Sequence, residues 1–138
     1  MEVQVHHAEE VKQMYNAFNR GDIPFIISTL HKDCIWEVMG QPDVPYAGIY
    51  HGPGDVAGFF EQLNKLVEFT EMVPEHILEA SNNLVVTTGH YKGKIRKTNK
   101  PVSSIFTMFT EFDDAGKVIH FRDCYDTLSV AKAFGKSK

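Results

Sequence analysis

The chain has 138 residues and a formal net charge of −4, and its 43% hydrophobic and 23% charged residues are typical of a single globular domain over residues 1–138. The acidic balance argues against nucleic acid as a partner, because phosphate binding needs clustered Lys and Arg side chains, and no apolar run is long enough to span a membrane. Two cysteines and a polar N-terminus without a signal pattern favour a reduced compartment, so the cytoplasm is the expected location.

The first predicted element is an amphipathic helix. Its apolar stripe has helical spacing and consists of Val11, Met14, Tyr15 and Phe18. Gly21 supplies a left-handed end for this helix, and Asp22 is a suitable N-cap for a second, short helix. Residues 34–39 have the pattern of a strand, and residues 40–54 are rich in Gly, Pro and Asp, which predicts a loop.

The second half of the chain begins with a helix and continues as strands. Apolar side chains keep the helical period for three turns over residues 56–67. From Phe69 onward the pattern alternates with period two, which predicts a meander of four antiparallel strands. The turns between these strands are predicted at residues 81–83, 98–101 and 113–116. A last short helix is predicted near residues 128–134.

This order of elements predicts an α+β fold. Helices that are segregated from an antiparallel sheet must cover one of its faces, and a curved sheet leaves a cavity beneath them. The strand that contains Ile105, Thr107 and Phe109 on one face also carries Phe106 and Met108 on the other. Since the helices cover only one face, we expect the second face to pack against another copy of the chain in a homodimer.

Four segments together resemble one known superfamily. They are Tyr15-Asn-Ala-Phe-Asn-Arg-Gly-Asp22, Trp36-Glu-Val-Met-Gly40, Pro45-Tyr-Ala-Gly-Ile-Tyr-His-Gly52 and Gly116-Lys-Val-Ile-His-Phe-Arg-Asp-Cys-Tyr-Asp-Thr127. Their order and spacing resemble the nuclear transport factor 2-like superfamily, within its SnoaL-like and ketosteroid-isomerase-related branch, over nearly the whole chain. The resemblance implies a cone-shaped α+β barrel, a curved sheet wrapped around N-terminal helices with an internal pocket. It does not imply one activity, because this fold carries isomerases, cyclases, hydrolases and non-catalytic modules.

The catalytic residues of these enzymes are matched only in part. The positions that resemble the base and the two oxyanion-hole residues of ketosteroid isomerases hold Val38, Met108 and Met14, so the resemblance implies that this chemistry is missing. Asp123 resembles an acid of limonene-epoxide hydrolases, but the strand that should hold the rest of that set has no acid. Asp126 resembles the Asp that precedes the C-terminal stretch of SnoaL-like cyclases.

Asp123, His90 and Asp126 are the candidate catalytic residues. Strand alternation places Asp123 on the same face as Phe121 and Tyr125. The resemblance implies that this face lines the cavity. Aromatic side chains around the carboxyl group of Asp123 would raise its pKa. The alternative role of Asp123 is a structural ion pair with Lys or Arg. His90 could act as its partner base or be a structural strand residue, and Asp126 could instead be the N-cap of the last helix.

The predicted ligand is a small hydrophobic molecule held in a pocket of a few hundred cubic ångströms. The predicted ligand-binding residues are Tyr15, Trp36, Val38, Tyr46, Phe60, Met108, Phe121 and Tyr125. The seven histidines are scattered without the spacing of metal ligands, and no phosphate-binding loop is present, so we expect neither a metal nor a cofactor. The sequence therefore favours a cofactor-independent acid–base isomerase, cyclase or hydrolase, with a non-catalytic ligand-binding or dimerisation module as the alternative.

Overall fold

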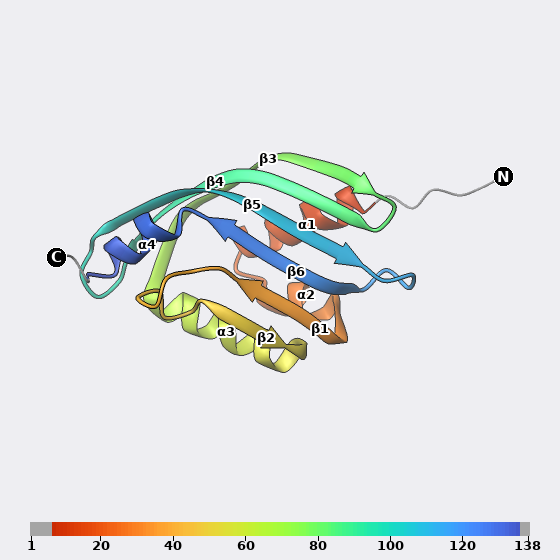
Figure 1. Ribbon diagram of the computed structural model, residues 1–138, viewed down its shortest axis with the longest axis horizontal. Helices are drawn as coiled ribbons and strands as arrows, with labels where there is room; N and C mark the ends of the chain where they lie inside the picture. Colours follow the sequence, from red (N-terminus) through yellow and green to blue (C-terminus); the bar gives the residue numbers. More distant parts are fainter. Residues whose placement is uncertain (1–6, 136–138) are drawn as a thin grey trace.

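The computed structural model describes residues 7–135, which form four helices and six strands within that range (Figure 1). The helices are α1 (Ala8–Asn19), α2 (Ile23–Ser28), α3 (Gly52–Leu66) and α4 (Thr127–Ala133). The strands are β1 (Leu30–Val38), β2 (Gly48–His51), β3 (Val67–Ser81), β4 (Leu84–Ile95), β5 (Pro101–Phe112) and β6 (Val118–Tyr125).

The six strands form one curved sheet in the order β2-β1-β6-β5-β4-β3. Figure 1 shows the sheet bending from β3 at the top to β1 and β2 at the bottom, with α1, α2 and α3 on its inner side. The α+β class and the curved sheet around N-terminal helices are confirmed. The sheet is not closed into a barrel, because β2 and β3 remain as its two edges.

Two features of the sheet differ from the prediction. The segment predicted as a loop contains β2, which pairs antiparallel with β1 through Trp36 and Tyr50. β2 is only four residues long and mostly exposed, so it has no apolar alternation that would reveal a strand. The sheet is also not wholly antiparallel, because β1 pairs with β6 in parallel, with Trp36 beside Phe121 and Val38 beside Asp123.

The curvature of the sheet depends on a close approach between β3 and β4. A Cβ atom added at Gly89 would lie 2.1 Å from the carbonyl oxygen of Val73, so only glycine fits there. The register between these two strands also shifts near Pro74, which is the mark of a β-bulge. Bulges and glycines bend a strand locally, and here they fold the β3–β4 hairpin over the helices.

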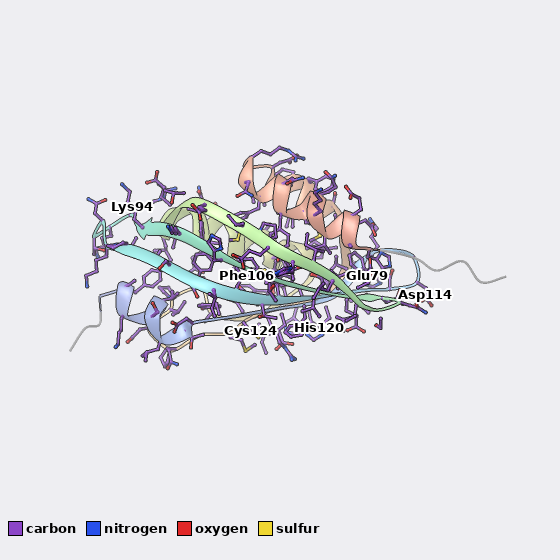
Figure 2. The ribbon with its side chains drawn as sticks, turned by 90° about the horizontal axis from the view of Figure 1, so that it is seen from above. Glu79, Lys94, Phe106, Asp114, His120 and Cys124 are labelled. Carbon is purple, nitrogen blue, oxygen red and sulfur yellow. The ribbon has the colours of Figure 1, made fainter. Side chains whose placement is uncertain are left out.

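The helices are fixed by caps and by their apolar faces. The carboxylate of Asp22 accepts a hydrogen bond from Phe25 N at 3.1 Å and so caps α2, as predicted. The apolar faces of α1 and α3 point into the core, and their buried residues are Val11, Met14, Tyr15, Ala17, Val56, Phe59, Phe60 and Leu63. Figure 2 shows α1 on one side of the sheet, and His120 and Cys124 on the side away from it.

Candidate functional site

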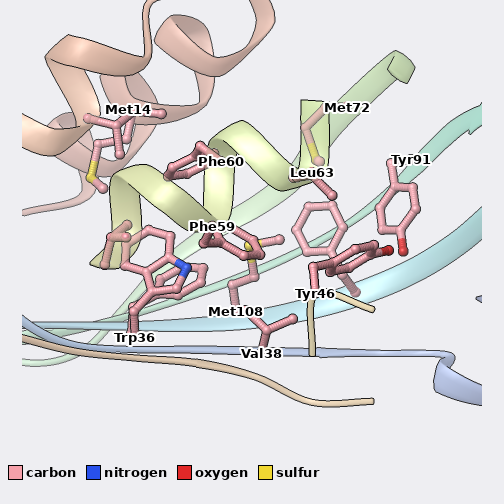
Figure 3. Close-up of a cluster of buried hydrophobic side chains, with 14 of the residues drawn as sticks. Met14, Trp36, Val38, Tyr46, Phe59, Phe60, Leu63, Met72, Tyr91 and Met108 are labelled. Atoms are coloured by element: carbon pink, nitrogen blue, oxygen red, sulfur yellow. The ribbon is translucent and has the colours of Figure 1, made fainter. Parts of the chain in front are cut away.

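A cavity of about 90 Å³ lies between the inner face of the sheet and the helices α1 and α3. Its wall is almost entirely apolar and contains seven of the eight predicted ligand-binding residues: Tyr15, Trp36, Tyr46, Phe60, Met108, Phe121 and Tyr125. The eighth, Val38, is buried in the core but does not line the cavity. The cavity is smaller than predicted, because large aromatic rings occupy much of the space under the sheet (Figure 3).

Asp123 is the acidic residue of this wall. It lies on β6 with Phe121 and Tyr125 on either side at alternate positions, and all three side chains face inward. Its Oδ1 atom is inaccessible to solvent and has no hydrogen-bond partner in residues 7–135. Burial disfavours the charged carboxylate and raises the pKa of Asp123 from 3.8 to about 7.

Four tyrosines surround this carboxyl group. Burial raises the pKa of each phenol above its ordinary value, and the negative charge of Asp123 adds to the effect. They are Tyr15, Tyr46, Tyr91 and Tyr125, and all four remain neutral hydrogen-bond donors at physiological pH. The Tyr15 hydroxyl donates to the sulfur of Met108 at 2.9 Å, and Figure 3 shows the hydroxyl groups of Tyr46 and Tyr91 close to each other. The Tyr125 hydroxyl is buried without a partner among the described residues.

Trp36 forms a flat apolar part of the wall. Its ring stacks on Phe121 with centroids 3.8 Å apart and planes 20° from parallel, across the β1–β6 pairing. The edge of Phe60 packs against the same indole at 5.7 Å. The indole Nε1 is buried and has no hydrogen-bond partner within the described part of the chain. Trp36 therefore offers a ligand an aromatic surface and one free donor.

His90 does not lie in the cavity. Side chains alternate along β4, and because Tyr91 lines the cavity its neighbour His90 points to the outer face of the sheet. There its two ring nitrogens lie 2.8 Å from the carboxylates of Glu71 and Glu75. Hydrogen bonding to Glu71, and then to Glu75, raises the pKa of His90. His90 is therefore a structural outer-face residue and not the partner of Asp123 that was predicted.

Asp126 is also outside the cavity. Its carboxylate accepts a hydrogen bond from Ser129 N at 3.1 Å and caps α4, which is the alternative role considered for it. Of the three predicted catalytic residues, the structure therefore brings only Asp123 to the cavity. Its alternative role as a structural ion pair is not seen, since no Lys or Arg pairs with it within residues 7–135.

Several wall residues were not predicted as site residues. They include Phe18, Phe59, Leu63, Phe69, Met72, Tyr91 and Thr110. Tyr91 could have been found from the alternation of β4, because it is the one large ring that shares a face with Val85, Thr87 and Gly89. The residues on α1, α3 and β3 were recognisable as apolar, but nothing in their spacing separates a cavity wall from a filled core.

Among residues 7–135, no three His, Cys, Asp or Glu side chains gather in a way that could hold a metal ion. None of the helices in that range has the length and hydropathy that crossing a membrane requires.

Comparison with known proteins links the chain to one domain family and to solved structures of the same fold. The model of the SnoaL-like domain matches residues 11–121. An NTF2-like protein from Burkholderia thailandensis is 26% identical, with a TM-score of 0.82 over 96% of this chain and 98% of that one. No curated protein matches the chain significantly.

Two less similar structures share the fold alone. One is a protein from Pseudomonas putida proposed to be a polyketide cyclase, which is 18% identical with a TM-score of 0.76 over 94% of this chain and 98% of that one. The other is a protein from Bacillus subtilis proposed to be an isomerase, which is 17% identical with a TM-score of 0.79 over 94% of each chain.

Proposed function

Because the chain belongs to the SnoaL-like domain family, we propose that it binds a small apolar molecule in the cavity and exchanges a proton with it through Asp123. The fold supports this proposal, since proteins with the same architecture have been proposed to be isomerases and a polyketide cyclase. Isomerisation next to a carbonyl requires a group that removes a proton from one carbon and returns it to another. Ring closure by addition to a carbonyl requires removal of a proton from carbon and delivery of a proton to the new alkoxide oxygen.

The observation that carries the proposal is the state of the Asp123 carboxyl. With a pKa of about 7, this group is present as both acid and carboxylate at neutral pH. A general acid–base catalyst is most effective when its pKa lies near the working pH. The unpartnered Oδ1 atom leaves a position at which a ligand proton could be received.

The remaining polar groups of the wall would orient the ligand. The hydroxyl of Tyr125 and the Nε1 of Trp36 are buried donors without protein partners, and a buried donor is stabilised when a ligand oxygen accepts its hydrogen bond. The aromatic wall formed by Trp36, Phe60 and Phe121 suits a flat ring. The part of the ligand that enters the cavity is therefore a compact ring with a carbonyl or hydroxyl oxygen.

The alternative is a non-catalytic module that only binds such a ligand. One observation favours it: Asp123 is the single carboxyl or imidazole group among the residues that line the cavity, so no second group is available to relay a proton. The two functions share the binding step and differ in whether Asp123 exchanges a proton with bound ligand.

Deuterium exchange separates the two functions without knowledge of the reaction. A ligand is first found by native mass spectrometry against a library of hydrophobic metabolites and is then incubated with the protein in D2O. The wild-type protein should incorporate deuterium at an acidic carbon of the ligand, and Asp123→Asn should lose this exchange while its affinity stays within a few-fold. Asp126→Asn is the matched control, since Asn keeps the helix cap, and it should exchange like the wild type.

Exchange that persists in Asp123→Asn would overturn the role of Asp123. Binding without exchange in the wild type would instead establish the non-catalytic alternative.

A further inference from the structure

A second hollow lies beside the cavity, and we call it the outer groove. It has a volume of about 460 Å³ and lies between the end of α1, the start of α2, one side of α3, the start of β3 and Arg96, which follows β4. Its polar rim consists of Asn19, Glu61, Asn64, Glu68 and Arg96. The groove has the size of a ligand site, whereas the cavity of about 90 Å³ is below the usual range of roughly 300–1,000 Å³.

The cavity and the outer groove share one wall. The residues common to both are Phe18, Phe60, Leu63 and Phe69, which come from α1, α3 and β3. Phe18 packs edge-on against Phe69 with centroids 5.3 Å apart, and Phe18 and Phe69 are both only half-buried. A partition of three phenylalanines and one leucine from separate elements can open by rotation of side chains. Such an opening would join the two hollows into one site with Asp123 on its inner wall.

The polar side chains of the rim can form hydrogen bonds with a ligand, but they are not arranged to bind a negatively charged group. Arg96 is already engaged, because its Nε donates to the carbonyl of Asn64 at 2.7 Å and its guanidinium lies 3.8 Å from Glu68. Asn19 donates through its side-chain nitrogen to the carbonyl of Met72 at 3.0 Å, which leaves its oxygen as an acceptor. Glu61 forms no ion pair within residues 7–135 and adds two further acceptor oxygens.

Hydroxyl groups match this rim best. The side-chain nitrogen of Asn64 remains a donor, while Glu61 and Asn19 accept, and a hydroxyl both donates and accepts. The two acidic side chains and one arginine give the rim a formal charge of −1, which disfavours a carboxylate or sulfonate.

We infer that the outer groove binds the polar end of the same molecule whose apolar end enters the cavity. The ligand is then elongated, with a ring-sized apolar head and a neutral, hydroxyl-bearing tail such as a sugar or polyol. This inference rests on the proposed function, because the head is the part that meets Asp123.

Three probes with one head and different tails test the inference. They are 4-methoxyphenol, which has no tail, 4-hydroxyphenyl β-glucoside, which has a neutral tail, and 4-hydroxyphenoxyacetate, which has an anionic tail. Trp36 is the single tryptophan of the chain and lines the cavity, so its fluorescence reports entry of the head. The glucoside should bind about fivefold to tenfold more tightly than 4-methoxyphenol, as expected for one or two added hydrogen bonds, and the anionic probe should bind more weakly than the glucoside.

Variants of rim residues test whether the outer groove causes the differences in affinity between the probes. Asn64→Ala should remove most of the advantage of the glucoside without changing the affinity for 4-methoxyphenol, and Glu61→Gln should improve binding of the anionic probe. Lys65→Ala is the control, since Lys65 is exposed in the same helical turn but does not line the groove.

The possible failures are distinguishable. Equal affinities for the glucoside and 4-methoxyphenol, with both probes reporting through Trp36, would overturn the inference and leave the proposed function standing. Failure of all three probes to reach Trp36 would overturn the inference and the binding function together. Unchanged deuterium exchange in Asp123→Asn would overturn the proposed catalysis alone.

Discussion

The carboxyl group of Asp123 should make folding stability depend on pH. Its pKa is about 7 in the folded protein and close to its ordinary value of about 3.9 when unfolded. The folded state therefore holds the proton more tightly, so the contribution of Asp123 to stability is complete below about pH 4 and is lost as the pH rises through about 7. Between pH 5 and pH 8 this loss amounts to roughly 3 kcal/mol in the free energy of unfolding. Asp123→Asn should remove this part of the pH dependence, as measured by urea denaturation at several pH values.

Asp113→Asn is the matched control for this measurement. A hydrogen bond from the backbone N–H of Lys117 lowers the pKa of Asp113, so the stabilising effect of Asp113 is lost only in acid. The control variant should therefore keep the wild-type slope between pH 5 and pH 8. A slope in Asp123→Asn equal to that of the wild type would show that Asp123 is not protonated in the folded protein at neutral pH.

For single residues, the sequence predicts the face on which a side chain lies where the strand has clear alternation. Phe121, Asp123 and Tyr125 lie on the inner face of β6 as predicted. The prediction for His90 is wrong because the chemistry of an imidazole does not determine the face of a strand on which it lies, and alternation gives the inner face to its neighbour Tyr91. The absence of a basic partner for Asp123 within the described residues could not be predicted, since it depends on which strands become neighbours.

Among the elements, the β3–β4 hairpin holds the glycine whose added Cβ atom would make the closest contact within residues 7–135. Gly89→Ala places a Cβ atom 2.1 Å from the carbonyl oxygen of Val73, so the backbone of β3 must move and the protein should lose about 1–3 kcal/mol of stability. Gly58→Ala has no heavy atom within 4 Å and lies within α3, so it should gain about 0.5–1 kcal/mol. Thermal denaturation of both variants checks the prediction, and a stability of Gly89→Ala equal to wild type would contradict it.

The partition between α1, α3 and β3 should control access to the cavity. Phe18→Ala removes the ring that packs against both Phe60 and Phe69, so acrylamide should quench the fluorescence of Trp36 more strongly, by about twofold or more. Phe25→Ala is the control, because Phe25 is also a half-buried phenylalanine but does not line either hollow. Equal quenching in the two variants would place the route to the cavity elsewhere.

Most elements could be predicted because each carries its own periodicity. The helices α1 and α3 and the strands β3 to β6 have runs of apolar residues with a clear period. β2 has too few residues for a period, and the parallel pairing of β1 with β6 is a long-range contact with no local signal. The small volume of the cavity also follows from the packing of rings from several elements, which no single segment determines.

For the molecule as a whole, we propose that the outer face of the sheet forms a homodimer. Ile105 on β5 is 73% exposed at this face, next to His90 on β4. Ion pairs within the face already engage several of its charges, including Glu37 with Arg122. A sheet-to-sheet interface should bury more than about 1,000 Å² in total.

Ile105→Lys tests the dimer. Light scattering should give the mass of a dimer for the wild type at micromolar concentration and the mass of a monomer for this variant, because a lysine would be buried without a partner. Leu128→Lys is the control, since Leu128 is also exposed but lies on α4 and not on the sheet. A monomeric wild type would exclude the proposed interface.

The position of β6 has a consequence for the synthesis of the protein. β6 is the last strand to leave the ribosome, yet it lies between β1 and β5 and joins the two parts of the sheet. Until it emerges, the β1–β2 pair and the β3–β5 meander each present an open edge, which is the kind of surface that pairs with other unfinished chains. Asp123 lies on this same strand. The cavity therefore gains its acidic residue in the same step in which β6 joins the two parts of the sheet. A chain arrested before residue 118 should therefore be bound by chaperones and be unable to hold a ligand.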